Sequence, residues 1–408
     1  MTQPMAGAPP VPATTASATE SESSIPASPA HGENAVRIQL FARTDVGQVR
    51  EHNEDNFLVA DLTKRSRGLL EANRATAIGQ QGAIFAVCDG MGGAAAGEIA
   101  SQLAVDIIYE RLVDGLGDRP VKRDDLARRL VRAVEAAGLR IFHEAKADRS
   151  RRGMGTTVTA AALVDEVLFF AQVGDSRGYI LRGDTLVQLT RDQSLVNQLI
   201  EAGQLTEEEA ETFEHNNIIL QALGTSDTVQ VDLTYAEVRK GDILLLCSDG
   251  LSGMVRFEDI REVLRSGMEP LEICKSLTER ANAAGGHDNI TVIIVQFDGP
   301  TLKEKDAPEG DPLKYRKYVL ADEREEDKTA TMTAPNPGGI APAAGATPEA
   351  ARTASNPPAQ WHERGAHGDH DYDRVDIPGT HVPIWMVVGI VTGVIVLLAG
   401  TAFLLLRP

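Results

Sequence analysis

Cysteines, aromatic side chains and basic runs are all scarce in this 408-residue sequence. Its three cysteines, Cys88, Cys247 and Cys274, lie too far apart for a zinc knuckle, and we expect free thiols in a reducing cytoplasm. Lysine and arginine number 40 against 59 aspartates and glutamates, so the formal net charge is −19. Because no basic run is long enough to follow a nucleic-acid backbone, we expect no nucleic-acid partner.

The apolar residues are distributed unevenly along the chain. Residues 1–32 are mostly Ala, Pro, Ser, Thr and Glu, without the basic and apolar regions of a secretory signal, and predict a disordered arm. Residues 301–381 turn polar again, with APNPGGIAPAAGATPEAART at their centre, and predict a flexible linker. Residues 33–300 are therefore the expected folded domain.

One long apolar run follows the linker. Residues 382–406 hold no charged side chain, and as a helix they would measure about 37 Å, enough to cross a hydrocarbon core of about 30 Å. Only Arg407 and Pro408 follow, so we expect a single-pass C-terminal anchor with the preceding domain in the cytoplasm. Gly389 and Gly393 form a GxxxG pair that favours weak self-association, unless these small residues simply face lipid.

The central part of the chain alternates between strand-like and helix-like patterns. Apolar strand-like runs extend from VRIQLFARTDVG at its start to DNITVIIVQF at its end. Between them, two helical patterns each place apolar side chains on one face: Ile99, Leu103, Ile107 and Leu112 in the first, Leu126, Leu130, Val134 and Ile141 in the second. Strands bunched between helix pairs predict an α+β fold of two packed antiparallel sheets with helices outside. The C-terminal transmembrane helix would be added to it.

The stretch VCDGMGGAAAGE, residues 87–98, has two interpretations. Its glycines fit the G-x-G-x-x-A spacing of a dinucleotide-binding turn. A Rossmann unit, however, needs a second strand after the first helix, with an acidic residue near its end about 20 residues beyond the glycines. The acidic candidates Asp106 and Glu110 lie inside the predicted helix, which favours the other interpretation, a turn that presents Asp89.

Carboxylates stand at the ends of the most apolar predicted strands: Glu54, Asp55, Asp89, Asp175, Asp249 and Asp288. A single Asp-Gly after a strand is more often a plain turn. Carboxylates gathered at one end of a core, however, repel one another and resist ionisation unless cations compensate them. Only Arg50 and Arg177 lie near these motifs, so the pattern predicts Mg²⁺ or Mn²⁺, which prefer oxygen ligands.

A pair of such ions indicates a particular chemistry. Two ions about 3.5–4 Å apart can share a bridging hydroxide and stabilise the attacking and leaving oxygens of an in-line displacement. A phosphate ester is the natural substrate, and the planar fork of Arg50 can bind two phosphate oxygens.

The sequence resembles the metal-dependent protein phosphatase family (PPM, type 2C), especially its bacterial serine/threonine phosphatases. The resemblance covers about residues 35–298 and rests on eight segments in order: TDVGQVREHNEDNF, VCDGMGGAAAGE, GMGTTVTAA, VGDSRGYI, LTRDQSLV, QALG, LLCSDGL and GGHDNITVIIV. It implies a sandwich with helix pairs outside and a two-metal centre at one edge. There, a metal-bridged hydroxide would hydrolyse phosphoserine and phosphothreonine.

The resemblance also implies roles for individual residues. The direct ligands of the two ions, Mn²⁺ or Mg²⁺, would be Asp55, Asp89, Asp249, Asp288 and the carbonyl of Gly90. Glu54 would orient a metal-bound water, and Arg50 would hold the phosphate. Asp175, together with Asp249, would hold a third and weaker metal ion.

Other features of the sequence leave alternatives open. Met91 stands where animal members carry a histidine, so the proton donor to the leaving group is His52, His287 or a metal-bound water. Residues 194–217 match in position a mobile flap near the metal centre, or form a surface helix pair. The histidines and aspartates of the linker form either a transition-metal site or a solvated spacer: His362, His367, Asp369, His370 and Asp371.

Two functions of different classes remain from the sequence. The first is an active, membrane-tethered phosphatase that acts on phosphorylated proteins and opposes a serine/threonine kinase at the same membrane. The second is a catalytically silent interaction module that keeps the fold. Because every expected carboxylate is present, the sequence favours the enzyme.

Overall fold

The computed structural model describes residues 36–68, 75–92, 96–210, 213, 217–305 and 312–320. The predicted N-terminal arm, the apolar run 382–406 with its GxxxG pair, and the linker histidines lie outside these ranges. None of the helices inside them is both long and apolar enough to cross a membrane.

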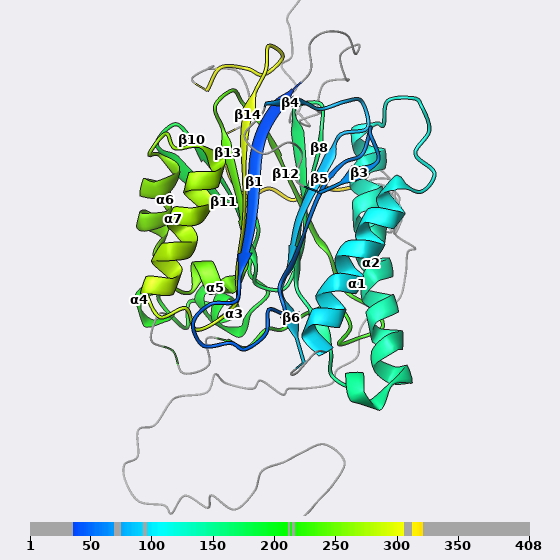
Figure 1. The fold of residues 1–408 in the computed structure, drawn as a ribbon, viewed down its shortest axis with the longest axis vertical. Helices are drawn as coiled ribbons and strands as arrows, with labels where there is room; N and C mark the ends of the chain where they lie inside the picture. The colour runs from blue at the N-terminus through cyan, green and yellow to red at the C-terminus, as the bar shows by residue number, and fades with distance from the viewer. Residues whose placement is uncertain are drawn as a thin grey trace, which may run out of the picture. The chain divides into compact units, whose positions relative to one another are not determined.

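Two antiparallel sheets of six strands each face one another (Figure 1). The first sheet has the order β11-β10-β13-β14-β1-β4: β11 (Thr185–Gln188), β10 (Arg177–Arg182), β13 (Ile243–Cys247), β14 (Ile290–Asp298), β1 (Arg37–Asp45) and β4 (Thr76–Ala77). The second has the order β12-β9-β8-β5-β2-β3: β12 (Asp232–Glu237), β9 (Val167–Val173), β8 (Val158–Val164), β5 (Ala83–Cys88), β2 (Asn56–Asp61) and β3 (Ser66–Arg67). A small separate ladder joins β6 (Gly90–Met91) to β7 (Gly155–Thr156).

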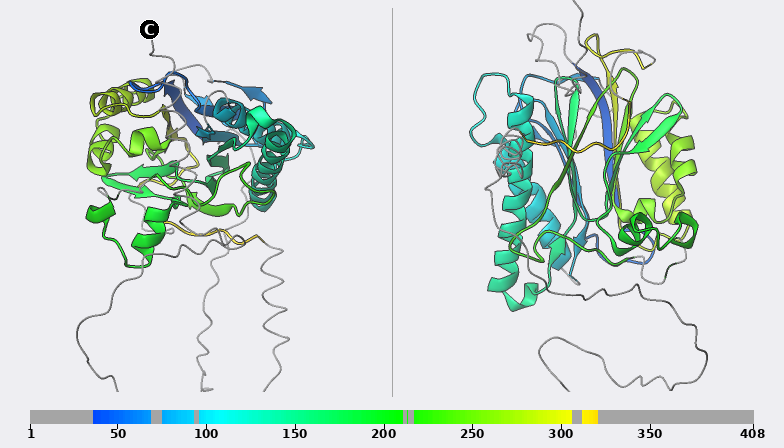
Figure 2. Two further views of the ribbon diagram at one scale, coloured as in Figure 1. Left: turned by 90° about the horizontal axis from the view of Figure 1, so that it is seen from below. Right: turned by 180° about the vertical axis from the view of Figure 1, so that it is seen from behind.

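Helices cover the outer face of each sheet, as the view from behind shows (Figure 2). Long helices α1 (Ala96–Val113) and α2 (Arg123–Ala147) pack on the second sheet. The first sheet is covered by α5 (Asp249–Ser252), α6 (Phe257–Leu264) and α7 (Pro270–Ala283). Two short helices, α3 (Leu195–Glu201) and α4 (Glu207–Ala210), and a 3₁₀ turn (Arg149–Arg151) complete the described elements. The predicted α+β fold with two antiparallel sheets and helices outside is confirmed.

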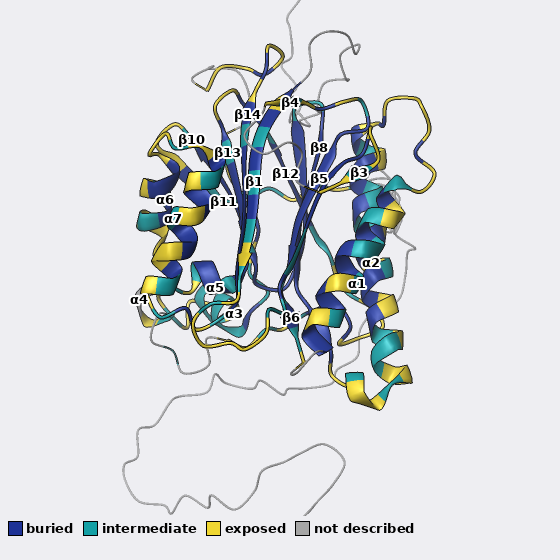
Figure 3. Cartoon of the chain, in the orientation of Figure 1, coloured by how far each residue is buried: buried dark blue, intermediate teal, exposed yellow. Residues whose placement is uncertain are grey.

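Three apolar layers hold the domain together, one between the sheets and one under each helical layer. The strands are buried almost throughout, whereas the helices are buried only on their inner sides (Figure 3). The layer between the sheets contains Phe85, Phe170 and Ile293, none of which is exposed to solvent. Burial on both faces explains why the strands read as continuous apolar runs.

The buried face of α1 differs from the predicted one. Of the predicted residues, Leu112 is fully buried, while Ile99, Leu103 and Ile107 are only partly buried against the same core. The other fully buried residues of α1 include Ala100, Ala104 and Ile108. Small side chains on the inner face let α1 approach its neighbours closely, so the larger residues lie at the flank. In α2, by contrast, the predicted residues are all buried: Leu126, Leu130, Val134 and Ile141.

Part of the predicted linker packs on the domain. Residues 312–320 run antiparallel beside the edge strand β12, where the Tyr318 amide donates to the Leu233 carbonyl at 2.8 Å. The Tyr318 ring contacts Phe169 edge-on at a centroid distance of 4.9 Å. This segment therefore covers an otherwise open sheet edge.

Replacing a phenylalanine tests the packing of the apolar layer between the two sheets. We expect Phe170→Ala to lower the free energy of unfolding by about 3–5 kcal/mol, because it leaves a cavity in the closed inter-sheet layer. Phe257→Ala is the matched control, since Phe257 is 39% exposed. Urea denaturation followed by circular dichroism measures both variants, and equal losses for the two would contradict the assigned core.

Candidate metal centre

Strand pairing brings the predicted site residues to one end of the sandwich, at the bottom of Figure 1 near β6 and α5. Asn56 pairs with Cys88 between β2 and β5, and Cys247 pairs with Val292 between β13 and β14. The residues next to these pairs therefore lie at the same end of the two sheets. They are Asp55 before β2, Asp89 after β5, Asp249 at the start of α5 and Asp288 before β14.

Asp55 is buried and held through only one of its two carboxylate oxygens. Its Oδ2 accepts hydrogen bonds from Ser248 Oγ and Thr291 Oγ1, both at 2.7 Å. Its Oδ1 is buried and has no hydrogen-bond partner. A buried acceptor without a donor costs free energy, so this geometry leaves an oxygen suited to a cation.

Two further carboxylates have the same feature. Asp175 Oδ1 and Asp249 Oδ1 are also buried without a hydrogen-bond partner. Asp175 lies in the turn between β9 and β10, and its charge interacts with that of Asp249. The two residues predicted to share a third metal ion are thus electrostatic neighbours.

The carboxylates of this cluster resist ionisation in the metal-free protein. Burial raises the pKa of Asp55 to about 8; the hydrogen bonds from Thr291 and Ser248 lower it, and the charges of Asp249 and Asp288 raise it. Burial and then the charge of Asp249 raise the pKa of Asp175 to about 7.

The pKa values of Asp89 and Asp249 are raised as well. For Asp89 the causes are burial followed by the charges of Asp55 and Asp249. For Asp249 they are burial followed by the charge of Asp288. These mutual effects show that the carboxylates lie close enough to repel one another.

Arg50 is the cation beside this cluster. Its Nη2 donates to Asp288 Oδ2 at 2.7 Å, and its side chain remains 48% exposed. Burial lowers the pKa of Arg50, but the charges of Asp288 and Glu54 raise it by more, so that the net effect is a rise. The guanidinium therefore lies at the solvent-facing edge of the acidic cluster, where an incoming anion would meet it.

Gly90 stands where the backbone leaves no room for a side chain. A Cβ atom there would lie 2.4 Å from the carbonyl oxygen of Gly97 and 2.5 Å from that of Glu54. A Cβ on Gly97 would lie 2.7 Å from Glu54 Oε2. The two glycines thus allow the start of α1 to approach Glu54 and the turn after Asp89, which agrees with the second interpretation of VCDGMGGAAAGE.

Glu54 lies beside the cluster rather than in its centre. Burial raises its pKa, Arg50 lowers it, and the charge of Asp288 raises it again. Its backbone is fixed, since its amide donates to Asn289 Oδ1 at 2.7 Å and its carbonyl accepts from Ser101 Oγ at 2.6 Å. The side chain is therefore partly buried and close to both Arg50 and Asp288.

Asn289, Ser248 and Thr291 are structural partners that sequence reasoning missed. Asn289 Nδ2 donates to the carbonyls of Val46 and His52, at 2.9 and 3.0 Å, and so closes the loop that carries Arg50. All three lie within the segments that carry the family resemblance, and only that position in the sequence could have drawn attention to them.

The structure does not bring every candidate into the cluster. His52 and His287 are exposed, so neither is enclosed with the carboxylates. The flap candidate 194–217 contains α3 and α4 but is described only in part. No group of three or more His, Cys, Asp and Glu side chains in the described ranges is arranged to hold a metal ion as it stands.

The donor set nevertheless fits a hard divalent cation. All the candidate side-chain ligands are carboxylates, and three of their oxygens are buried without partners. Burial and neighbouring charges raise the pKa values of four of them: Asp55, Asp89, Asp175 and Asp249. A bound cation would reverse each of these penalties. The ligand assignments made from the sequence stay predictions.

Comparison with known proteins agrees with this arrangement. The family model "Protein phosphatase 2C" matches residues 69–283. The protein phosphatase PhpP of Streptococcus pneumoniae is 39% identical over 270 residues, which are 66% of this chain and 100% of that protein.

Solved structures are also similar to this chain. The serine/threonine phosphatase PstP/Ppp of Mycobacterium tuberculosis is 36% identical, with a TM-score of 0.54 over 64% of this chain and 99% of that one. The catalytic domain of PstP in complex with two manganese ions is also 36% identical, with a TM-score of 0.53. It covers 64% of this chain and 99% of its own. The chain therefore belongs to the protein phosphatase 2C family.

Proposed function

We propose that this protein phosphatase hydrolyses phosphoserine and phosphothreonine in proteins, with two Mn²⁺ or Mg²⁺ ions held by the carboxylate cluster. The observation that carries the proposal is the state of Asp55, whose Oδ2 is fixed by Ser248 and Thr291 while its Oδ1 is buried and unpaired. The names of the similar proteins and the manganese ions in PstP support the same chemistry.

Each residue of the cluster has a role in this proposal. Asp55, Asp89, Asp249, Asp288 and the Gly90 carbonyl would hold the two ions. When bound, such ions polarise the phosphoryl group and supply an activated water as nucleophile. The carboxylates keep their position because the surrounding backbone is closely packed and, for Asp55, because two hydroxyl groups orient it.

Arg50 and Glu54 act around the ions. Arg50 exchanges its contact with Asp288 for two phosphate oxygens, which its planar fork matches, and so orients the ester. Glu54 accepts a hydrogen bond from water at the edge of the cluster. Asp175 and Asp249 would hold a third, weaker ion.

We also propose that the domain acts at a membrane. The charge-free run 382–406 would anchor the chain, with the domain in the cytoplasm and weak self-association through Gly389 and Gly393. Tethering raises the effective concentration of membrane-bound phosphoproteins, so a serine/threonine kinase of the same membrane and its substrates are the expected partners.

Removal of one central carboxylate tests the proposed activity. We expect the full chain in detergent to hydrolyse a phosphothreonine peptide only when Mn²⁺ or Mg²⁺ is present. We expect Asp249→Asn to lose at least about 100-fold in kcat/KM, because the neutral amide binds a divalent cation weakly. Asp184→Asn, in the exposed turn between β10 and β11, is the control and keeps full activity. Absence of metal-dependent turnover in the unaltered chain would instead favour a silent interaction module.

The hydroxyl groups that hold Asp55 provide a second test. Thr291→Val removes one of its two hydrogen bonds at nearly constant volume, and we expect the affinity for Mn²⁺ to fall about 10- to 100-fold. Thr291→Ser keeps the hydroxyl and is expected to keep the affinity. Calorimetric titration of the metal-free protein with Mn²⁺ measures this directly. If the Val and Ser variants lose affinity equally, the hydrogen bond is not what orients Asp55.

Truncation tests the proposed anchor. We expect the full chain to remain in bacterial membranes after extraction with alkaline carbonate, and a chain ending at residue 381 to be found in the soluble fraction. The two chains differ only beyond residue 381, where the apolar run 382–406 lies, and the truncated chain ends in the polar linker. Release of the full chain by carbonate would contradict the proposal.

A further inference from the structure

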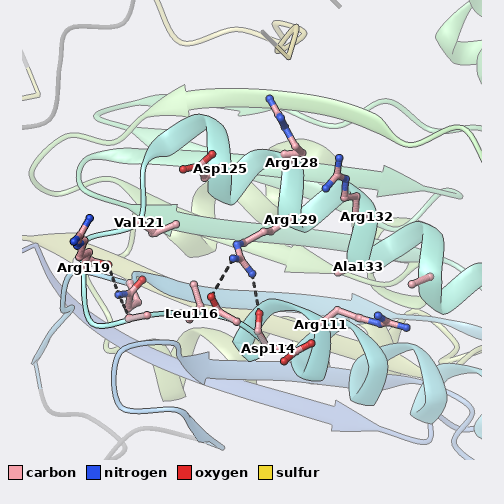
Figure 4. Close-up of a pocket in the computed structure, with 14 residues that line it drawn as sticks. Arg111, Asp114, Leu116, Arg119, Val121, Asp125, Arg128, Arg129, Arg132 and Ala133 are labelled. Atoms are coloured by element: carbon pink, nitrogen blue, oxygen red, sulfur yellow. Dashed lines mark hydrogen bonds between the residues drawn. The ribbon is translucent and has the colours of Figure 1, made fainter. Parts of the chain in front are cut away.

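A basic pocket lies between the end of α1, the start of α2 and the loop that joins them (Figure 4). Its volume is about 640 Å³, and its lining includes five arginines: Arg111, Arg119, Arg128, Arg129 and Arg132. Two aspartates, Asp114 and Asp125, also line it, so positive charge prevails. This is unexpected in a chain whose formal net charge is −19.

The loop that forms one wall is held by side chains from its surroundings. Every carbonyl from Asp114 to Arg119 accepts a side-chain hydrogen bond. The donors are Arg65, Gln80, Gln81 and Arg129. Each carbonyl acceptor of this loop thus has a partner, and these bonds fix the conformation of the loop before any ligand arrives.

Some of the backbone donors of the same loop are used: the amides of Asp114 and Leu116 donate to the carbonyls of Glu110 and Val113. Within the described part of the chain, the amide N–H groups of Gly117, Asp118 and Arg119 make no hydrogen bond. A loop whose carbonyls all have partners while three successive amides have none is a donor-rich surface, which favours anions.

Two of the arginines hold the local structure, and three are available to bind a ligand. Arg129 donates to the carbonyls of Asp114 and Gly115, at 2.8 and 3.2 Å, and so closes the end of α1. Arg128 pairs with Asp124 at 2.8 Å. The side chains of Arg111, Arg119 and Arg132 are exposed and form no ion pair or hydrogen bond with the described residues. Three guanidinium groups, one from each wall, are therefore available to a ligand.

We propose that this pocket binds a small soluble anion with two or more phosphate groups. Guanidinium groups and backbone amides match phosphate oxygens, and several positive charges around one pocket favour a polyanion over a single charge. The volume lies within the range of small-molecule sites and is several times that of one phosphate.

This site is distinct from the carboxylate cluster. It lies at the C-terminal end of α1, whereas Gly97 at the N-terminal end packs against Gly90 and Glu54. The 18 residues of α1 span about 27 Å at about 1.5 Å per residue. The pocket therefore does not depend on the proposed catalytic function.

Pyrophosphate binding to the metal-free protein tests the proposal. The full chain is kept in detergent with a chelator, which removes any contribution from bound cations, and pyrophosphate is titrated by calorimetry. We expect one site per chain, with an affinity that falls by at least about tenfold in R111Q/R132Q, because two charge-assisted contacts are lost. R140Q, on the same helix and paired with Glu144 outside the pocket, is the matched control and is expected to bind as the unaltered chain does.

A second variant keeps the test decisive if the double variant is poorly folded. R119Q alters only the exposed loop, and circular dichroism establishes that each variant is folded. Loss of affinity in R119Q with retention in R140Q supports the site. Absence of pyrophosphate binding in the unaltered chain, or equal binding in all variants, overturns it.

Discussion

Repulsion among buried carboxylates is the constraint on which the rest of this structure depends. Asp55, Asp89, Asp175 and Asp249 lie close enough at one end of the sandwich to raise one another's pKa values, and burial raises them further. Without cations, such a cluster costs free energy and would not persist for packing alone. A pair of divalent cations would turn this cost into binding free energy, which would account for the acids at the ends of rigid strands.

The framework around the cluster fixes the acids by close backbone contacts and by a few polar side chains. Gly90 and Gly97 allow the start of α1 to approach the turn after β5, while Asn289 ties the loop carrying Arg50 to β14. Ser248 and Thr291 hold Asp55 by hydrogen bonds to its Oδ2. Since the contacts of Asn289, Ser248 and Thr291 join segments distant in sequence, the site exists only in the folded domain. The described carboxylates are held near one another but are not arranged as a complete set of metal ligands, so metal binding would complete the geometry.

The sequence predicted the fold and the positions of the acids, because both are encoded locally. Apolar runs with an aspartate at the end identified the strand ends, and the period of Leu126, Leu130 and Val134 identified a helix face that the structure buries. The inner face of α1 was recognised only at Leu112, since alanines carry a weaker apolar signal than Ile99 and Leu103. The roles of Ser248, Thr291 and Asn289, and the packing of residues 312–320 on β12, depend on tertiary contacts with no local signature.

The central claim is that the carboxylate cluster holds two divalent cations side by side. Electron paramagnetic resonance of the metal-free full chain during titration with Mn²⁺ tests it most directly. The account predicts two Mn²⁺ ions per chain with a spin-coupled spectrum, since ions about 3.5–4 Å apart share ligands. Uncoupled Mn²⁺ signals only, or no bound Mn²⁺, would contradict it.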